Sequence, residues 1–424
     1  MSVAAALAAA TAGNAHAAGF ALIEHGAAGL GNAFAGGAAE AGDLSTIWFN
    51  PAGMTRFDGG HVQLAAHGIE LEFKFEDRGS LALPGNTGGR SDDGGIGALI
   101  PANYALYAIN DRLRVGLGLN VPFGLKTKYD PGWIGRYQAI KSEIMTINVN
   151  PAVSFDVIPD RLSIGAGVSA MYINAELTQA VNLTALAGTA LPDGFLRFKA
   201  NDWSFGYNVG AMFQFNPDAR IGVHYRAEVR QKLEGNSRVT GVPPAPALAP
   251  VSAALNGAIS VDVDLPASLS LSGFWRFHEQ WALMADATWT EWSSIPRLKI
   301  DFDSGAPSRV EELNWDDTWR VSVGLNYYYN PKWTWRFGVA FDESPVPNAE
   351  FRTARLPDND RLWVSLGVGY AWSDNLQLDA GWAHLFIDDT RINRDTLATS
   401  GSLLVGNYDS SADVVGVQAR YRFQ

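Results

Sequence analysis

The sequence predicts an all-β fold, a transmembrane antiparallel β-barrel of about 14 strands with an N-terminal plug inside its lumen. Three observations lead to this prediction. Apolar and polar residues alternate along most of the chain, tight turns alternate with long loops, and residues 18–58 lack the alternation. Successive side chains of a strand point to opposite faces, so alternation gives a sheet one apolar and one polar face. A closed sheet with its apolar face turned to lipid is typical of outer-membrane barrels.

The alternation is clearest in the last ten residues. One face would carry Val415, Val417, Ala419, Tyr421 and Phe423, with polar residues or glycine between them. A half-buried strand of a soluble protein has the same pattern, but here the pattern recurs at 113–121, 221–230, 319–327 and 362–370. A soluble propeller or sandwich remains the alternative, although the chain has no blade-like internal repeat.

The connections between the strands fall into two classes. Turn-forming residues mark six tight turns, at 110–111, 159–160, 216–218, 278–279, 330–331 and 373–374. Seven long loops lie near 75–98, 124–141, 178–198, 232–258, 294–311, 342–360 and 388–408. Short turns alternating with long external loops imply about 14 strands and an outer-membrane barrel. We therefore assign residues 59–424 to a multi-pass barrel in a Gram-negative outer membrane, and we expect a monomer that contacts outer-membrane lipid and lipopolysaccharide.

Composition excludes several classes of function. The chain has no cysteine, so disulfides and cysteine-based catalysis or metal binding are excluded. A formal net charge of −12 argues against nucleic acid as a partner. Mean hydropathy near zero, with no apolar run long enough for a spanning helix, argues against a helical membrane protein. We expect no cofactor, no metal site and no enzymatic activity.

Residues 1–17 have the features of a signal peptide. Residues 2–12 are almost all Ala, Val and Leu, and Ala15-His16-Ala17 fits the A-x-A cleavage pattern. The positive charge expected at the start is absent, which is consistent with a true start upstream of Met1. The alternative is a helical N-terminus of the mature protein. We expect the mature chain to begin at Ala18.

Residues 18–58 should form the plug. The segment is rich in Gly and Ala and contains Asn50-Pro51-Ala52. Its apolar residues, which include Phe20, Ile47 and Phe49, favour packing in the lumen over a disordered tail.

Several motifs resemble those of FadL-type long-chain fatty acid transporters. They are the 18–20 start, the Gly-Leu-Gly-Asn-Ala-Phe run at 29–34, Asn50-Pro51-Ala52, the 225–229 segment, the tyrosines at 327–329, the 341–347 segment with its Ser-Pro-Val-Pro loop and the 357–361 segment. The resemblance runs from the plug to the C-terminus. It implies a 14-stranded barrel whose N-terminal hatch gates the uptake of long-chain fatty acids, or of aromatic hydrocarbons in some relatives. The final Gln424 departs from the usual aromatic end of such barrels.

The third strand contains a break that the resemblance makes important. Asn120, Pro122, Phe123 and Gly124 lie where the alternation of this strand stops. Proline cannot donate to a strand ladder and glycine favours a bend, so the wall should be interrupted here. In the resembling family a kink in this strand opens a lateral path from lumen to lipid. The simpler alternative is that the strand ends at Pro122.

Candidate substrate-binding residues come from three places. The loops 183–196 and 242–255 are unusually apolar, and such patches often mark binding sites, although packing on the barrel mouth is the alternative. We select Leu191, Phe195 and Leu248 from these loops, and Phe20 from the mature start. By the two-residue period, Arg226, Arg230, Arg320 and Arg361 should point into the lumen, where one of them would pair with a carboxylate. Arg226 and Arg320 are preferred.

Three functions are therefore compared. The first is passive transport of a hydrophobic molecule, the second an open porin for polar solutes, and the third a lipid hydrolase. His224 and His384 are the only candidates for the hydrolase, and the seven histidines show no metal-binding spacing. The apolar loops and the plug favour transport, and the inward arginines favour a fatty acid as the cargo.

Overall fold

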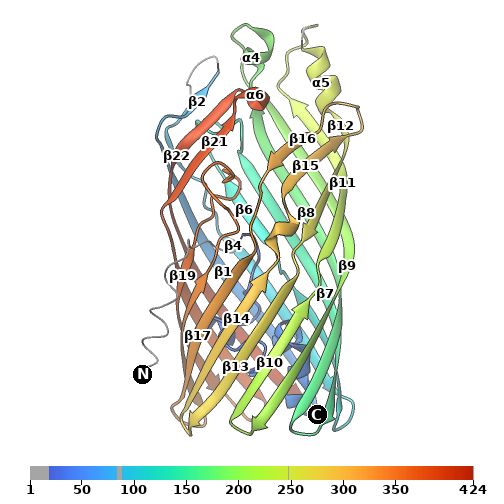
Figure 1. Cartoon of the computed structure of the whole chain (residues 1–424), viewed down its shortest axis with the longest axis vertical. Coiled ribbons are helices and arrows are strands. Elements are labelled where there is room, and N and C mark those ends of the chain that lie inside the picture. The colour runs from blue at the N-terminus through green and yellow to red at the C-terminus, as the bar shows by residue number, and fades with distance from the viewer. Residues whose placement is uncertain (1–18, 84–87, 247, 424) are drawn as a thin grey trace.

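The computed structural model describes residues 19–83, 88–246 and 248–423, and these form one closed antiparallel barrel around a plug (Figure 1). Within these residues, fourteen strands pair in a ring and confirm the predicted fold class. They are β1(Gly60–Asp77), β4(Ala98–Ala108), β5(Leu113–Asn120), β7(Lys141–Ile158), β8(Leu162–Val181), β9(Gly194–Asn216), β10(Ala219–Arg226), β13(Ser268–His278), β14(Trp281–Thr290), β17(Thr318–Tyr328), β18(Trp333–Asp342), β19(Arg361–Ala371), β20(Leu376–Ile387) and β22(Ser402–Phe423). β1 closes the ring by pairing with β22 from Gly60↔Phe423 to Asp77↔Gly406.

Shorter elements extend the wall at the end that carries the long loops (Figure 1). They are β2(Leu81–Ala82), β3(Ser91–Asp93), β6(Gly124–Lys128), β11(Val229–Thr240), β12(Gly257–Leu265), β15(Arg297–Phe302), β16(Arg309–Glu312), β21(Thr390–Thr396), α4(Leu183–Ala187), α5(Ala249–Leu255), α6(Leu397–Ser400) and the 3-10 turn η2(Trp292–Ser294). All six predicted tight turns connect consecutive barrel strands at the opposite end. The two ends therefore have the predicted asymmetry.

The outer face of the barrel changes character along its height. On β1 the exposed outward residues are apolar at Val62 and Leu64, and charged at Glu70, Glu72 and Glu76. The apolar zone is the surface that lipid would cover. In the described part of the chain no helix is both long and apolar enough to cross a membrane.

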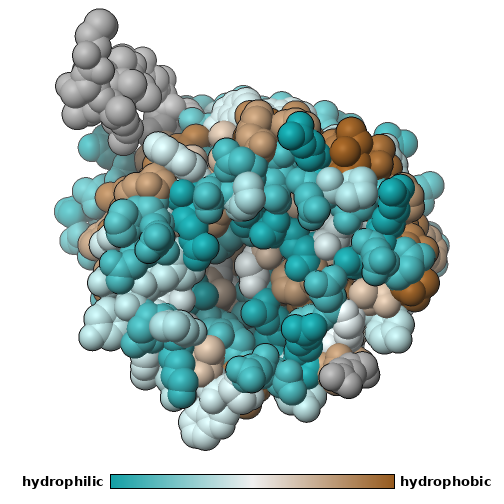
Figure 2. All heavy atoms as spheres, turned by 90° about the horizontal axis from the view of Figure 1, so that it is seen from below, coloured by the Kyte–Doolittle hydropathy of each residue, from teal (hydrophilic) through white to brown (hydrophobic). Residues whose placement is uncertain are grey.

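The plug predicted for residues 18–58 lies inside the half of the barrel that carries the short turns, from Gly19 onward (Figure 1). It contains α2(Ala27–Gly31), α3(Thr46–Phe49) and the 3-10 helix η1(Pro51–Arg56). Viewed from the turn end, hydrophilic residues lie across the barrel and hydrophobic ones gather toward its perimeter (Figure 2). Residues 1–17, predicted to be a signal peptide, lie outside the described residues. We call residues 19–58 the hatch.

Glycines on the inner wall allow the hatch to approach the strands closely. A Cβ added at Gly381 would lie 2.6 Å from the carbonyl oxygen of Ala27, and one at Gly367 would lie 2.6 Å from the Cα of Gly31. Real Cβ atoms are not found at such distances, so larger residues there would displace the hatch backbone. Other inner-wall glycines in the same situation are Gly165, Gly210, Gly222 and Gly338.

The structure corrects the predicted orientation of Arg230. Residues 221–230 were expected to form one strand, but β10 ends at Arg226 and β11 begins at Val229. Residues 227–233 face only the six residues 202–207, and this one extra residue reverses the alternation. Arg226 is therefore buried on the inside, whereas Arg230 lies on the outer face and pairs with Glu228 at 2.6 Å. The Arg230 side chain is 79% exposed and cannot contact a luminal ligand.

Candidate functional site

The wall is interrupted between β5 and β6. Asn120 pairs with Asn148 of β7, and Gly124 pairs with Met145, so residues 121–123 face only residues 146–147. Three residues opposite two make a β-bulge, which bends a strand. Pro122 lies within it, where its missing N–H costs the ladder nothing.

The neighbouring strand β4 does not follow this bend. Its pairing with β5 runs only from Ala108↔Arg114 to Asn103↔Leu119, so residues 98–102 have no strand partner on that side. The wall closes again above the gap, where the Lys128 amide donates to the Gly94 carbonyl at 3.0 Å. We call the opening between residues 98–102 and β6 the wall gap.

The hatch supplies the backbone partners that β4 does not. The amide of Leu22 donates to the carbonyl of Pro122 at 2.8 Å, and the amide of Gly124 donates to the carbonyl of Phe20 at 2.9 Å. On the other side, the Thr146 hydroxyl accepts from the Phe123 amide at 2.9 Å. The bulge is therefore held between β7 and residues 20–22 of the hatch, an extended segment that forms an antiparallel bridge through Ala21↔Phe123 and that we call the hatch strand.

Asn120 fixes the lower end of the bulge. Its side-chain oxygen accepts from the Asn148 amide group at 3.0 Å, and its own amide group lies 3.4 Å from the Tyr104 hydroxyl. Asn120 is fully buried. All four residues predicted to form the lateral opening thus lie at the border of the wall gap.

A cavity of about 360 Å³ lies in the lumen directly behind the wall gap. Its floor is the hatch, through Phe34, Trp48 and Phe49, and its lining includes both Ile100 and Leu99 of β4. Ile100 is buried whereas Leu99 is 74% exposed on the outer face. Because residues from both faces of β4 line it, this lower cavity continues through the gap toward the outer surface.

A cluster of aromatic rings separates the lower cavity from a second one. The Phe20 ring lies 5.2 Å from Trp292, 5.8 Å from Phe123 and 6.0 Å from Trp315. Beyond Phe20 lies an upper cavity of about 110 Å³ whose lining is almost entirely apolar. Its residues include Ile173, Leu177, Phe198, Leu233, Val261, Ile300 and Leu313. Phe20 borders both cavities.

Three of the predicted arginines line the lower cavity: Arg226, Arg320 and Arg361. Arg226 is held by neutral groups, because it donates to the Ser169 hydroxyl at 3.0 Å and the Trp48 carbonyl at 2.9 Å. Its guanidinium also lies 3.3 Å from the centre of the Trp48 ring, a cation–π contact. Arg226 therefore links β10 to the hatch.

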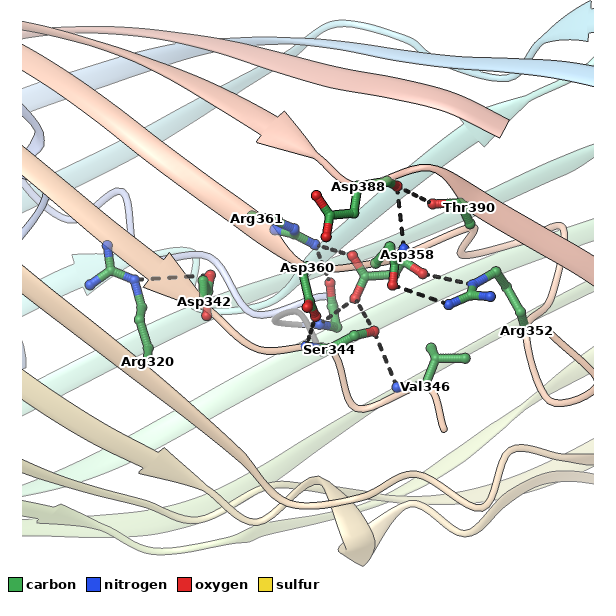
Figure 3. A network of polar contacts seen from close by, with 12 residues as sticks. Arg320, Asp342, Ser344, Val346, Arg352, Asp358, Asp360, Arg361, Asp388 and Thr390 are labelled. Atoms are coloured by element: carbon green, nitrogen blue, oxygen red, sulfur yellow. Dashed lines mark hydrogen bonds and ion pairs between the residues drawn. The ribbon is translucent and has the colours of Figure 1, made fainter. Parts of the chain in front are cut away.

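Arg320 has free donors. Its Nη2 donates to the Ala33 carbonyl at 3.0 Å, and its Nε lies 3.9 Å from the Asp342 carboxylate (Figure 3). Nε and Nη1 are buried and have no hydrogen-bond acceptor among the described residues. Buried donors without acceptors are costly, so the cavity beside Arg320 offers a place for an anionic group.

Arg361 instead anchors the start of the hatch (Figure 3). Its Nη2 donates to Asp358 at 2.7 Å and to the Gly19 carbonyl at 3.1 Å. The Gly19 amide donates to the same Asp358 carboxylate at 2.9 Å, and the Ser344 hydroxyl donates to it at 3.2 Å. Burial and the nearby Asp388 carboxylate raise the pKa of Asp360, next to this anchor, to about 7.

Asn50 is the central residue of the hatch. Its side-chain amide donates to the Ala38 carbonyl at 2.7 Å and to the Ala211 carbonyl of β9 at 3.1 Å. Its side-chain oxygen accepts from the Ala52 amide at 3.1 Å, and Pro51 begins η1. The Asn50-Pro51-Ala52 triplet, expected as part of the gating hatch, therefore joins two parts of the hatch to the wall.

The loop residues predicted to capture substrate have different surroundings. Leu248 is buried and Leu191 is partly buried, and both pack in the apolar cluster under α4 and α5. Phe195 is 39% exposed at the upper end of β9. Packing on the barrel mouth therefore accounts for Leu248, and Phe195 is the most accessible of the three.

Sequence reasoning missed Trp292 and Trp315 as cavity residues. Both tryptophans are buried against Phe20 in the lumen. Their signal in the sequence was their position on either side of the long 294–311 loop, outside the membrane-spanning part of a strand. Asp342 pairs across strands with Arg320 and lines the lower cavity.

Within the described residues, neither His224 nor His384 has a catalytic arrangement. His224 is buried beside Asn208, with 3.3 Å between its Nε2 and the amide nitrogen. His384 contacts Asp413 at 3.1 Å, on the outward-facing residues of β20 and β22. Among the described residues, no cluster of His, Asp and Glu is arranged to hold a metal ion.

Comparison with known proteins gives a consistent result. The model of the family described as "Outer membrane protein transport protein (OMPP1/FadL/TodX)" matches residues 8–423. A long-chain fatty acid transport protein of Escherichia coli is 29% identical over 397 residues, which cover 87% of this chain and 86% of the relative. Outer membrane protein P1 of Haemophilus influenzae is 30% identical over 455 residues, covering 97% and 96%.

Among solved structures, the crystal structure of a Pseudomonas aeruginosa FadL homologue superimposes with a TM-score of 0.89 at 29% identity. The match covers 96% of this chain and all of that one. The names of these three relatives describe transport, outer-membrane location or FadL homology, and none of the three names an enzyme.

Proposed function

The chain belongs to the outer-membrane protein transport family (OMPP1/FadL/TodX), and from that premise we propose that it carries long-chain fatty acids inward by diffusion. The observation that supports this cargo is Arg320, whose Nε and Nη1 are buried without acceptors beside a cavity with largely apolar walls. A fatty acid has one carboxylate for such an arginine and an acyl chain for the walls. The protein acts as a monomer and catalyses no reaction.

The route follows the two cavities. A fatty acid adsorbs near Phe195 at the barrel mouth, enters the upper cavity, passes Phe20 and reaches the lower cavity. It leaves sideways through the wall gap near Pro122 into the lipid, after the hatch around Asn50 rearranges. No energy source is needed, since the concentration gradient drives the flow.

The energetics divide between the two ends of the ligand. Each buried CH₂ contributes about 0.8 kcal/mol, so a long chain gains most of its affinity from the apolar walls. A hydrogen bond to a charged group adds about 1.5–3 kcal/mol. The arginine therefore orients the ligand and distinguishes an acid from an uncharged analogue.

The test compares the binding of a fatty acid with that of an uncharged analogue of the same chain length. Arg320→Gln should weaken oleate binding by about 10- to 100-fold, the equivalent of one charge-assisted bond, and leave oleyl alcohol binding unchanged. Arg320→Lys should restore part of the difference. Arg114→Gln is the matched control, because Arg114 faces inward but binds Phe57 and Asp58 near the turn end. If Arg320→Gln binds oleate as the wild type does, the carboxylate site is elsewhere or the cargo is not an acid.

Uptake of aromatic hydrocarbons is the second candidate. The upper cavity, which contains few charged groups, supports it, because an uncharged ring needs no counter-ion. Toluene binding tighter than oleate binding, and unaffected by Arg320→Gln, would favour this cargo. A general porin would instead give a large steady conductance in the intact protein, whereas we expect high conductance only after residues 18–50 are deleted.

A further inference from the structure

A row of cations crosses the outer face of five neighbouring strands above the apolar zone. The strand registers place these residues side by side on β6, β7, β8, β9 and β11: Lys128, Lys141, Thr178, Arg197 and Arg238. Four of the five positions are cationic and none is acidic; the fifth, Thr178, is buried. We call this set the cation row, and its longer strands are labelled on the right of Figure 1.

The sheet itself does not explain the cation row. Arg197 is directly opposite Arg238, and Lys128 is directly opposite Lys141, although like charges at such positions destabilise a sheet. Arg197 is paired with Glu176 at 2.6 Å, and Lys141 is paired with Glu143 at 2.6 Å and with Glu176 at 3.3 Å. Lys128 and Arg238, both exposed, have no ion pair within the described residues.

The opposite wall has the reverse charge. At comparable positions above the apolar zone, β1 and β22 present Glu70, Glu72, Glu76, Asp409 and Asp413, with Lys74 as the one cation of that group. The whole chain has a formal charge of −12. Cations gathered on one side of an acidic barrel therefore indicate an anionic partner on that side.

The height of the cation row narrows the choice of partner. On β9 the outward residues below Arg197 lead to Trp203 and Phe205, which are 55% and 71% exposed. Aromatic residues of this kind mark the lipid headgroup level of a barrel. Arg197 lies six residues further along the strand, about 20 Å at 3.3 Å per residue. With a strand tilt near 40°, the cations lie about 15 Å above the aromatic level.

We propose that the cation row binds the phosphate groups of lipopolysaccharide, whose acyl chains pack on the apolar face below. An amphiphile with phosphorylated sugars above its acyl chains matches both the charge and the vertical spacing. A phospholipid headgroup would reach the aromatic level but not the cation row. The proposal depends on the outer-membrane location and is independent of the transported cargo.

Removing three cations tests the proposal. The variant Lys128→Gln/Arg197→Gln/Arg238→Gln should bind lipopolysaccharide about 100-fold more weakly than the wild type, at roughly fivefold per cation near an anionic membrane surface. The measurement is titration of purified protein with lipopolysaccharide, read by native mass spectrometry. Arg112→Gln/Arg161→Gln/Lys332→Gln is the control, because it removes the same charge at exposed positions of the turn end. The control should stay within about twofold of the wild type, since surface charges several Debye lengths away are screened.

Three further ligands separate the sources of the anion. Dephosphorylated lipopolysaccharide should bind like the triple variant, phosphatidylglycerol should bind more weakly than lipopolysaccharide, and millimolar inorganic phosphate should not compete. Equal binding of phosphatidylglycerol, or equal loss in both triple variants, would overturn the proposal. If the triple variant loses its heat-shifted gel mobility and is therefore unfolded, Arg238→Gln alone, at an exposed site, should still weaken binding about fivefold.

Discussion

The third barrel strand (β5 and β6) and the seventh (β10 and β11) each contain one extra residue, but the wall is open only at the third. On the seventh, Arg226 pairs with Asn208 and Glu234 pairs with Asn201, so residues 227–233 face residues 202–207. Pairing resumes beyond the bulge on both sides, at Glu234↔Asn201 with β9 and at Val229↔Leu265 with β12. On the third, Asn120 and Gly124 enclose the bulge, and β4 keeps its pairing with β1 but has no partner in the third strand beyond Asn103↔Leu119.

The difference lies in the neighbouring strands. Beside the seventh strand, the strand formed by β12 and β13 is also interrupted, at Pro266. The seventh strand and this neighbour therefore bend together, and their pairing resumes at Val229↔Leu265. β4 has no such break and stays paired to β1 up to Ala98. The bulge in the third strand therefore opens the wall because β4 does not bend with it. The hatch supplies the backbone hydrogen bonds that β4 would otherwise make there.

Deleting Pro122 should have the largest effect, because it removes the extra residue of the third strand. Without it, two residues would face two, and the third strand would pair with β7 in one register from Leu113 to Lys128. The wall gap would close, and we expect fatty-acid uptake by cells to fall to the level of cells that lack the protein. Uptake of labelled oleate measures the effect.

The control for the deletion is Pro122→Gly, which keeps the bulge and its length. It should preserve most of the uptake, because the carbonyl of residue 122 still accepts from Leu22 and glycine tolerates a bend. Normal uptake after the deletion would mean that the cargo leaves by another path. A folded barrel in both variants, seen as heat-shifted gel mobility, is required for either conclusion.

The two bulges also explain what the sequence could and could not predict. Below the aromatic level the apolar residues of a strand face lipid, and above it they face the lumen. On β1 the sequence itself changes phase, from Val62 and Leu64 outside to Phe73 and Phe75 inside. On the seventh strand the alternation continues without a phase change and the bulge reverses the faces instead. No local pattern marks that bulge, so the orientation predicted for Arg230 was wrong.

Element number, turn positions and the interruption at Pro122 could be predicted, since each depends on local backbone chemistry. The cavity walls depend on contacts between distant segments, such as Phe20 with Trp292 and Trp315. The role of Arg361 as an anchor for Gly19 also required the fold, because the two residues are far apart in the sequence. Contacts between such distant residues cannot be predicted from the pattern of any single strand.

Phe20→Ala should have the second largest effect, because it weakens the hatch strand that replaces β4. Each of the three aromatic contacts of Phe20 contributes about 0.5–1.5 kcal/mol beyond the buried area, so the substitution should make hydrogen exchange at Gly124 about 30-fold faster. It should also join the two cavities and raise single-channel conductance. Phe277→Ala, at an exposed outer position near a turn, is the control. Unchanged exchange at Gly124 would show that the bulge is held by β7 alone.

The smallest expected effect is a pH dependence at the anchor of the hatch strand. Asp360 has its pKa raised from 3.8 to about 7, with burial as the first cause. Below about pH 4 the carboxyl is protonated in both the folded and the unfolded loop, and its stabilising contribution is complete. As the pH rises to about 7, the unfolded loop releases its proton first, so the folded loop becomes progressively less stable; above 7 the loss is constant.

Opening of the 342–360 loop should therefore increase by at least about tenfold between pH 4 and pH 8, since one pKa unit is a factor of ten. Hydrogen exchange at Ser344, whose amide donates to Asp360 at 3.3 Å, corrected for the intrinsic rate, measures it. Asp360→Asn should remove most of the dependence, whereas Asp389→Asn, at an exposed neighbouring position, should keep it. If exchange at Gly124 follows the same pH profile, the anchor at Gly19 and the hatch strand at the wall gap move together; if only Ser344 responds, the loop opens without the hatch.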